Sequence, residues 1–309
     1  MSKLRAAFFD LDGTLKLERD PYQVIHRSLG WGEKTQQFAE MYRRGEIDSD
    51  EWIRRDVRLW RGLRRDFLTA LVAQIPYTPG AGQVVTELKR AGALVVVVST
   101  GPQFHADRVK EELSLDCAIA NEVVFETDVA TGEVIINVRE ADKASIVTDL
   151  LKKTGISGDE CLAVGDGEAD VGMFEVCRLG VAVQPFSERV RRSAQIVLDR
   201  PDLSQLLTEV YELIPEWQGV VPCDQHMGES CPVVTRSEGV TYPLRTNDGQ
   251  REPGMDEENT VLANDVQEEL SNERFLSISS RDDVGAGHRR TSGSTVDAKI
   301  RPEIETGND

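Results

Sequence analysis

Short apolar runs that alternate with helical patterns are the feature that most constrains the fold of this chain. The runs are partly β-branched, are bounded by turn-forming residues, and cover 4–9, 93–99, 161–165 and 180–183. Between them, segments 82–92 and 142–155 carry apolar residues at helical spacing and end in glycine. Strands that alternate with helices form a parallel sheet covered on both faces. The sequence therefore predicts an α/β fold with a Rossmann-like parallel sheet.

Two segments depart from this alternation. Residues 121–138 predict two strands around "ATGE" at 130–133, which would form a small antiparallel hairpin beside the main sheet. Residues 16–76 contain three helical patterns, the last of which runs from 49 to 75 without a break. This insertion leaves directly after the first strand. We therefore expect a helical cap over the carboxyl ends of the strands, where open α/β sheets bind ligands.

The composition of the chain changes near residue 218. From there to residue 309 the only aromatic residues are Tyr242 and Phe275, and Gly, Ser, Thr and charged residues dominate. Such a segment cannot bury enough apolar surface to offset the entropy lost on ordering. We expect a core made of 1–15 and 77–217, a helical cap at 16–76, and a disordered acidic tail at 218–309.

The charge of the chain limits its partners. The formal net charge is −18, and an acidic surface repels nucleic-acid phosphates and anionic lipid headgroups. No apolar run approaches the roughly 18 residues of a membrane span, and the first residues lack the apolar segment of a secretory signal. We therefore expect a cytoplasmic protein with no nucleic-acid or membrane partner. Nothing in the sequence indicates an oligomeric state.

Polar motifs follow the predicted strands or open the helices beside them. Asp10 and Asp12 follow the first strand two positions apart, so that their carboxylates come near one point. The other members are Ser99 and Thr100 of "STG", Lys143 at the start of a helix, and Asp166 and Asp170 of "GDGEAD". Carboxylates gathered in this way repel one another unless a cation lies between them. The motifs therefore predict a cation-binding site at the carboxyl edge of the sheet.

This set of motifs resembles that of the haloacid dehalogenase superfamily of phosphohydrolases. The resemblance covers nearly all of residues 1–215, and the closest branch is that of the phosphoserine phosphatases, to which "GDGEADVGMF" and segment 108–123 are similar. It implies a phosphatase with that superfamily's fold. By the family's pattern, the Ser99 hydroxyl, the Thr100 backbone N–H and the Lys143 ammonium bind the transferring phosphate.

The chemistry of the two leading acids also follows from their residue type. A carboxylate is ionised at pH 7, so Asp10 can attack phosphorus without a separate base and form an aspartyl-phosphate. Asp12 would protonate the leaving oxygen and later deprotonate water, for which the neighbouring Asp10 should raise its pKa. An oxygen-only site beside a phosphate favours Mg²⁺, held by Asp10, Asp166 and the Asp12 carbonyl, with Asp170 nearby. Gly13 lets the backbone approach the phosphate closely.

Each of these residues also has an ordinary structural interpretation. An isolated "DLD" is often a solvated turn, Ser99 alone is often a helix cap, and Lys143 alone is often a surface charge. The two histidines of the folded part, His26 and His105, are interpreted as structural, because no pair has metal-ligand spacing. The order of the motifs at successive strand ends favours the functional interpretation.

Two alternatives to hydrolysis remain open at this point. A phosphotransferase or mutase of the same fold would pass the phosphoryl group to a second hydroxyl instead of water. A non-catalytic binding protein would recruit partners through the tail and keep only a residual site. The repulsive acidic cluster argues against the second alternative, because it offers nothing to a binding protein. The leading hypothesis is a hydrolase that acts on a small phosphorylated metabolite.

The cap departs from the phosphoserine phosphatase pattern at positions that bear on the substrate. In that branch, a cap segment similar to residues 45–57 carries an aromatic residue and an arginine that holds the substrate carboxylate. Those positions fall on Ser49 and Asp56 here. Asp56 would repel a carboxylate, which predicts that phosphoserine is a weak substrate and that an uncharged or cationic leaving group binds better.

Other departures lie near the same pocket. Ala169 stands where the branch has an asparagine, and Thr100 replaces a glycine. Glu18 is a candidate for holding a substrate amino group. Arg19 competes with it, because either residue can align with the family position that has this role. Arg54 and Arg55 are the candidates that could supply the lost positive charge.

Overall fold

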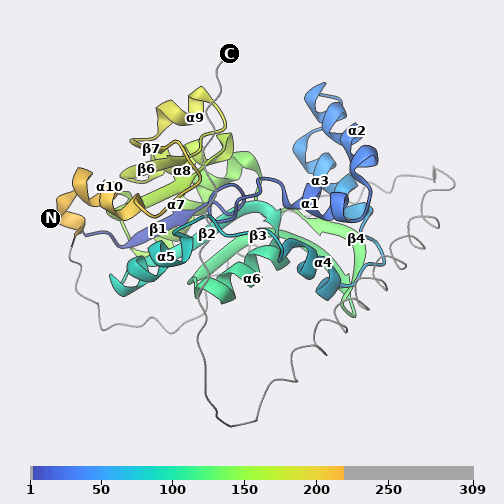
Figure 1. Ribbon diagram of the computed structural model, residues 1–309, viewed down its shortest axis with the longest axis horizontal. Coiled ribbons are helices and arrows are strands. Elements are labelled where there is room, and N and C mark those ends of the chain that lie inside the picture. The colour runs from blue at the N-terminus through green and yellow to red at the C-terminus, as the bar shows by residue number, and fades with distance from the viewer. Residues whose placement is uncertain (1–2, 219–309) are drawn as a thin grey trace, which may run out of the picture. The chain divides into compact units, whose positions relative to one another are not determined.

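The computed structural model describes residues 3–218, which form a seven-stranded sheet with helices on both faces (Figure 1). The predicted tail thus lies outside the described residues, apart from residue 218. The strands are β1 (Ala6–Phe9), β2 (Leu94–Pro102), β3 (Cys117–Glu126), β4 (Val129–Ile135), β5 (Cys161–Gly165), β6 (Leu179–Val183) and β7 (Ile196–Leu198). Their order is β4-β3-β2-β1-β5-β6-β7, and every neighbouring pair except β3 and β4 is parallel. The predicted α/β fold is confirmed.

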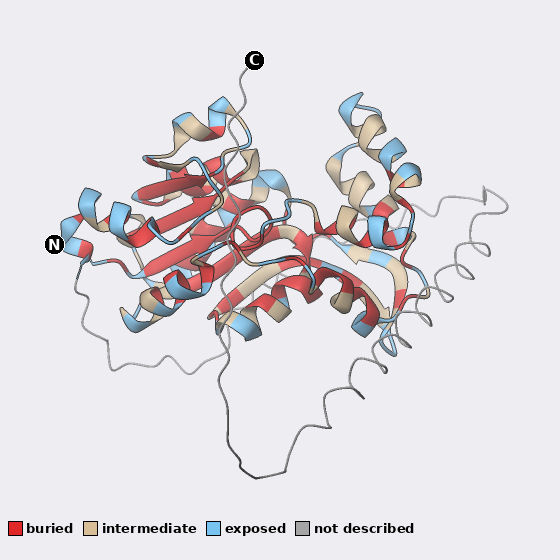
Figure 2. Cartoon of the chain, in the orientation of Figure 1, coloured by how far each residue is buried: buried red, intermediate tan, exposed pale blue. Residues whose placement is uncertain are grey.

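The helices cover the sheet as the alternation of the sequence requires. In the core they are α5 (Ala81–Arg90), α6 (Gln103–Leu113), α7 (Lys143–Thr154), α8 (Val171–Val176), α9 (Glu188–Ser193) and α10 (Leu206–Leu213). Helices α5, α6 and α10 pack with Ala7 and Phe9 of β1, whereas α7, α8 and α9 pack with Ala6 and Phe8. Alternate residues of β1 thus point to opposite faces, and both faces are buried (Figure 2).

Four helices come from the segment between β1 and α5, and two of them replace one predicted helix. They are α1 (Pro21–Ser28), α2 (Gly32–Arg43), α3 (Ser49–Arg58) and α4 (Arg65–Val72). The continuous helix predicted over 49–75 is wrong, because the chain turns at Gly62, whose φ is +89°. The Gly62 N–H donates to the Ala130 carbonyl at 2.9 Å, so the break docks this segment on β4. Figure 1 shows α3 beside β4 and α4 beside α6.

The predicted hairpin is present, but its turn and its position differ from expectation. The turn falls at Thr127 and Asp128, with φ of +49° and +64°, and not at "ATGE". Gly132, which suggested the turn, lies inside β4 with φ +82°, where the pairing with β3 shifts register. A glycine in a bulge carries the same local signal as a glycine in a turn. Because β3 also pairs with β2, the hairpin extends the main sheet.

Four short 3-10 helices complete the described part of the chain. They span Glu140–Asp142, Gly158–Glu160, Glu168–Asp170 and Pro215–Trp217. The first and third immediately precede α7 and α8 at the carboxyl edge of the sheet. Among residues 3–218, no helix has the length and apolar character needed to cross a membrane.

Candidate active site

The carboxyl ends of three adjacent strands bring the predicted motifs together. Asp10 directly follows β1, Ser99 lies in the last part of β2, and Asp166 directly follows β5. Because β1 pairs in parallel with both β2 and β5, these three ends meet at one edge of the sheet. All three side chains are buried. The arrangement that the order of the motifs predicted is therefore present.

Lys143 is the cation of this cluster. Its Nζ lies 2.5 Å from Asp10 Oδ1 and 2.7 Å from Asp170 Oδ1, and it comes from the first position of α7. Although burial opposes its charge, the two carboxylates raise the pKa of Lys143 above the ordinary value, so the ammonium stays charged. Burial, together with repulsion from Asp170 and Asp166, raises the pKa of Asp10 against the attraction of Lys143. The cluster thus holds more negative charge than one lysine neutralises.

Asp10, Asp166 and Asp170 form the candidate metal centre. Each offers one carboxylate oxygen, and these oxygens lie within 4.8 Å of one another in buried surroundings. Burial and the neighbouring Asp170 raise the pKa of Asp166 to about 7. The Asp12 side chain is not part of this group of three. Crowded, desolvated carboxylate oxygens are the donor set that a hard divalent cation prefers.

Arg19 also reaches this cluster, and the sequence identified it only as a competitor for the register of Glu18. Its Nε lies 2.9 Å from Asp166 Oδ2, and its NH2 group donates to the Gln184 carbonyl. Its guanidinium also lies over the ring of Phe186, at 5.5 Å from the centroid. Arg19 therefore partly neutralises Asp166 from the cap side.

Asp12 is held by a separate set of contacts. Its Oδ2 accepts a hydrogen bond from Ser99 Oγ at 3.0 Å, and its Oδ1 lies 3.3 Å from His105 Nε2. His105 is fully buried on α6. The interpretation of His105 as merely structural is therefore incomplete. Its position shortly after "STG", in the first turns of the next helix, was the signal that could have placed it here.

Two glycines make room for these carboxylates. Gly13 has φ +90°, and a Cβ there would lie 2.5 Å from Asp166 Oδ2. A Cβ on Gly101 would lie 2.6 Å from Asp12 Oδ2 and 3.0 Å from Ser99 Oγ. Any larger residue at either position would push the acids apart. Gly101, which completes "STG", was not among the predicted site residues.

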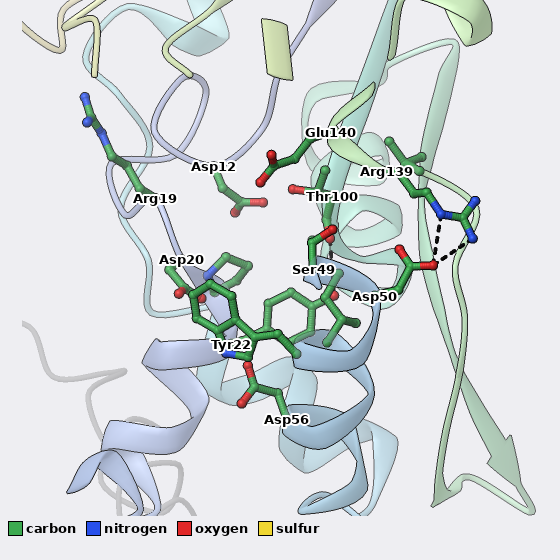
Figure 3. Close-up of a pocket in the computed structure, with 15 residues that line it drawn as sticks. Asp12, Arg19, Asp20, Tyr22, Ser49, Asp50, Asp56, Thr100, Arg139 and Glu140 are labelled. Atoms are coloured by element: carbon green, nitrogen blue, oxygen red, sulfur yellow. Dashed lines mark hydrogen bonds and ion pairs between the residues drawn. The ribbon is translucent and has the colours of Figure 1, made fainter. Parts of the chain in front are cut away.

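A pocket of about 180 Å³ opens beside Asp12 (Figure 3). From the cap segment it is lined by Arg19, Asp20, Tyr22, Ser49, Trp52 and Asp56, and from the core by Asp12, Thr100, Gly101, Arg139 and Glu140. The Thr100 carbonyl accepts hydrogen bonds from Tyr22 Oη at 3.2 Å and Asn121 Nδ2 at 2.8 Å. The pocket thus joins the acid at the end of β1 to helices α1 and α3.

Helix α3 places Ser49 and Asp56 on the pocket, whereas the other predicted cap residues lie elsewhere. Residues 49 and 56 share one helical face, since seven residues make about two turns. Arg54 donates to the Asp50 carbonyl at 3.3 Å, and Arg55 pairs with Glu51 at 2.8 Å. Neither arginine lines the pocket. The structure therefore does not give them the compensating role that the sequence suggested.

Glu18 also does not line the pocket. Its carboxylate pairs with Arg27 on the surface, at 3.1 Å. The cations that line the pocket are Arg19 and Arg139. Two nitrogens of Arg139 contact the same oxygen, Asp50 Oδ2, at 2.9 Å from Nε and 2.7 Å from NH2 (Figure 3). The charges at the pocket thus differ from those that the cap motif alone suggested.

Comparisons with known proteins agree with this geometry. Residues 7–175, more than half of the chain, match the haloacid dehalogenase-like hydrolase family. The chain is 38% identical over 179 residues to a phosphoserine phosphatase of Archaeoglobus fulgidus, covering 58% of this chain but only 52% of that relative. It is 30% identical over 208 residues to a phosphoserine phosphatase of Methanocaldococcus jannaschii, covering 66% of this chain and 97% of the relative.

Solved structures give the same result. A structure described as a phospho-aspartyl intermediate analogue of phosphoserine phosphatase matches with a TM-score of 0.59 and 29% identity, over 67% of this chain and 99% of that one. A substrate-bound phosphoserine phosphatase complex matches with a TM-score of 0.60 and 28% identity, over 68% and 99% of the two chains. The chain therefore belongs to the haloacid dehalogenase-like hydrolase family, in the branch of phosphatases that resembles the phosphoserine phosphatases.

Proposed function

We propose that the chain is a Mg²⁺-dependent phosphomonoester hydrolase that acts on a small phosphorylated metabolite through an aspartyl-phosphate. The observation that carries the proposal is the buried Asp10 at the end of β1, bound by Lys143 and flanked by Asp166 and Asp170. The similarity to a phospho-aspartyl intermediate analogue of a phosphoserine phosphatase supports it. We also propose that the protein is located in the cytoplasm. Its division into a core of residues 1–15 and 77–217 and a cap of residues 16–76 is a proposal as well.

Asp10 is the proposed nucleophile. One of its carboxylate oxygens attacks phosphorus, the bond to the leaving oxygen breaks, and an acyl phosphate forms on Asp10. Lys143 Nζ, 2.5 Å from Asp10 Oδ1, counters the charge of the acid and of the incoming phosphate. The backbone N–H of Thr100 is proposed as a further donor to the phosphate. The Ser99 hydroxyl is proposed to join it by turning away from Asp12, because a hydroxyl has one hydrogen to donate. Gly13 keeps side-chain atoms away from this approach.

Asp12 is the proposed general acid and base. Its carboxylate lines the pocket, where the leaving group of a substrate would lie. As a carboxylic acid it gives its proton to the leaving alkoxide, and as a carboxylate it takes a proton from the water that hydrolyses the acyl phosphate. Ser99 Oγ donates to Asp12 Oδ2, and His105 Nε2 lies 3.3 Å from Asp12 Oδ1 without forming a hydrogen bond to it.

The acids fit a divalent cation. The buried oxygens of Asp10, Asp166 and Asp170 repel one another, as the raised pKa of Asp10 and of Asp166 shows. Asp10, Asp166 and the Asp12 carbonyl would hold Mg²⁺, while Asp170 Oδ2 accepts from the N–H groups of Asp166 and Gly167 at 2.9 Å each and so fixes the loop. When bound, the metal supplies positive charge that offsets the phosphate oxygens.

The test is phosphate release from a panel of phosphomonoesters. Asp10→Asn keeps the volume but removes the nucleophile, so turnover should fall to background while the melting temperature stays near that of the wild type. EDTA should abolish activity, and added Mg²⁺ should restore it. Asp149→Asn, at an exposed position on α7, is the matched control and should keep full activity. Near-normal release by Asp10→Asn would disprove the covalent mechanism.

A further inference from the structure

The pocket contains a buried acid that the proposed phosphoryl transfer does not use. Asp56 on α3 is 3% exposed and lines the pocket beneath Tyr22 (Figure 3). Its Oδ1 has no hydrogen-bond partner among the described residues. A buried carboxylate oxygen without a donor is costly, which points to a donor supplied by a ligand.

The nearest basic group does not neutralise Asp56. His26 Nδ1 lies 3.8 Å from Asp56 Oδ1, too far for a hydrogen bond. His26 Nε2 accepts a hydrogen bond from Trp60 Nε1 at 3.0 Å, and burial lowers the pKa of His26 to about 4. The imidazole is therefore neutral at physiological pH and supplies no positive charge to Asp56.

A second acid adds to this negative charge from another element. Asp20 caps α1 by accepting from the Gln23 N–H, and it lines the same pocket. Asp20 lies close enough to Asp56 to raise its pKa, after burial, which is the larger cause. Two carboxylates from separate helices thus repel each other across the pocket wall, and a cation placed between them would relieve that repulsion.

The cations of the pocket are already engaged by other acids. Arg19 is held by Asp166, and Arg139 is held by Asp50. A substrate carboxylate would therefore compete with these acids for a positive charge and would meet the acidic side chains of the pocket. A protonated amine would find unneutralised acids instead.

We propose that Asp56, assisted by Asp20, binds a protonated primary amine on the leaving group, so that the preferred substrates are phosphomonoesters of small amino alcohols without a carboxylate. This inference rests on the proposed function. The cavity of about 180 Å³ accommodates a small leaving group. Tyr22 and Trp52 add aromatic walls that suit a cation. A primary ammonium has N–H donors for Asp56 Oδ1, whereas a quaternary ammonium has none.

The first test uses the wild-type protein with four esters at pH 8.5, where Asp56 is ionised and a primary amine is still protonated. We expect kcat/KM for 2-aminoethyl phosphate to exceed that for propyl phosphate, whose leaving group is nearly isosteric but uncharged, by about tenfold or more. Phosphoserine and choline phosphate should both have lower kcat/KM values than 2-aminoethyl phosphate. A phosphoserine value above that of 2-aminoethyl phosphate would overturn the proposal, since it would mean that an arginine becomes free to hold a carboxylate.

The second test removes the charge of the subsite. At the same pH of 8.5, where Asp56 is ionised, Asp56→Asn should lower the ratio of kcat/KM for 2-aminoethyl phosphate over propyl phosphate by about tenfold or more. Glu33→Gln removes an exposed acid at the start of α2 as the matched control and should leave the ratio unchanged. An unchanged ratio in Asp56→Asn would contradict the assignment.

A binding measurement keeps the proposal testable if Asp56→Asn does not fold. Calorimetric titration of the Asp10→Asn protein should show tighter binding of 2-aminoethyl phosphate than of propyl phosphate, and equal affinities would overturn the subsite. The outcomes also separate the two proposals. Equal kcat/KM values for propyl phosphate and 2-aminoethyl phosphate would refute the amine subsite alone. Failure to hydrolyse any phosphomonoester with Mg²⁺ present would refute the proposed function and this inference together.

Discussion

At the residue scale, Asp56 should make folding stability depend on pH. Burial and Asp20 raise its pKa from 3.8 to about 8. Between these values the folded protein keeps a proton that the unfolded chain releases. The contribution of Asp56 to stability is therefore full below about pH 4 and is lost as the pH rises through 8. The free energy of unfolding should fall by up to about 1.4 kcal/mol per pH unit within this window because of this residue.

Urea unfolding of the wild type and of Asp56→Asn at pH 5.5 and pH 7.5 measures this effect. The variant cannot lose the proton, so its stability relative to the wild type should rise with pH. Because Asp10 and Asp166 titrate in both proteins, their contributions cancel in the comparison. A difference between the two proteins that is constant with pH would show that Asp56 is ionised in the folded state throughout this range.

Also at the residue scale, His105 should matter for the chemical step. It lies 3.3 Å from the Asp12 oxygen that Ser99 does not bind. His105→Leu fills the buried position with an apolar side chain but leaves that oxygen without its neighbour. We expect kcat to fall about 10- to 100-fold, as for other partners that orient a reacting group, while KM changes little. Steady-state kinetics on propyl phosphate measures both constants, and His105→Gln should recover part of kcat.

At the element scale, Trp60 ties the cap helices to the core. It lies just after α3 and is fully buried, with its ring stacked on Tyr22 of α1 at 5.4 Å and edge-on to Phe104 of α6 at 6.2 Å. Its Nε1 donates to His26 of α1. One side chain therefore connects three helices, two of which carry residues of the pocket.

Trp60→Phe should consequently affect both stability and substrate binding. The loss of ring volume and of the hydrogen bond to His26 should lower the free energy of unfolding by about 1–3 kcal/mol. Because Tyr22 packs on this ring and lines the pocket, KM should rise more than kcat falls. Denaturation curves and steady-state kinetics together check the prediction. Leu71→Met, a nearly isosteric change in the buried face of α4, is a control that should leave KM unaltered.

At the scale of the whole molecule, the described fold should be complete at Trp217. This side chain is fully buried in the cluster that contains Val210 and Ile214. A chain that ends at Trp217 should keep its activity and melting temperature, because the sequence beyond it has few apolar side chains to bury.

Removal of four further residues, so that the chain ends at Leu213, should instead be costly. It deletes Ile214 and Trp217, and the loss of one large buried side chain costs about 3–5 kcal/mol. At about 2–4 °C per kcal/mol for a domain of this size, the melting temperature should drop by on the order of 10 °C. Differential scanning calorimetry of the three chains tests both statements. A fall of several degrees for the chain that ends at Trp217 would mean that later residues pack on the core.

Much of the fold was predictable because its signals are local. The apolar runs of β1, β5 and β6 and the terminating glycines of α5 and α7 depend on neighbouring residues alone. The prediction of local structure from sequence was wrong where the same residue type, glycine, occurs in two different structures. Gly62 permits a break that helical periodicity hides, and Gly132 lies in a bulge although it has the signature of a turn.

The sequence by itself determined the parallel sheet and the acids at its edge, and with them the class of chemistry. In a parallel sheet, residues that follow adjacent strands must meet, whatever the cap does. Only the tertiary structure decided which charges line the pocket. It placed Arg19 and Arg139 on the pocket in place of Glu18, Arg54 and Arg55, and His105 beside Asp12. These outcomes depend on how distant elements pack: Arg139 and its partner Asp50 are 89 residues apart, and no local pattern encodes that contact.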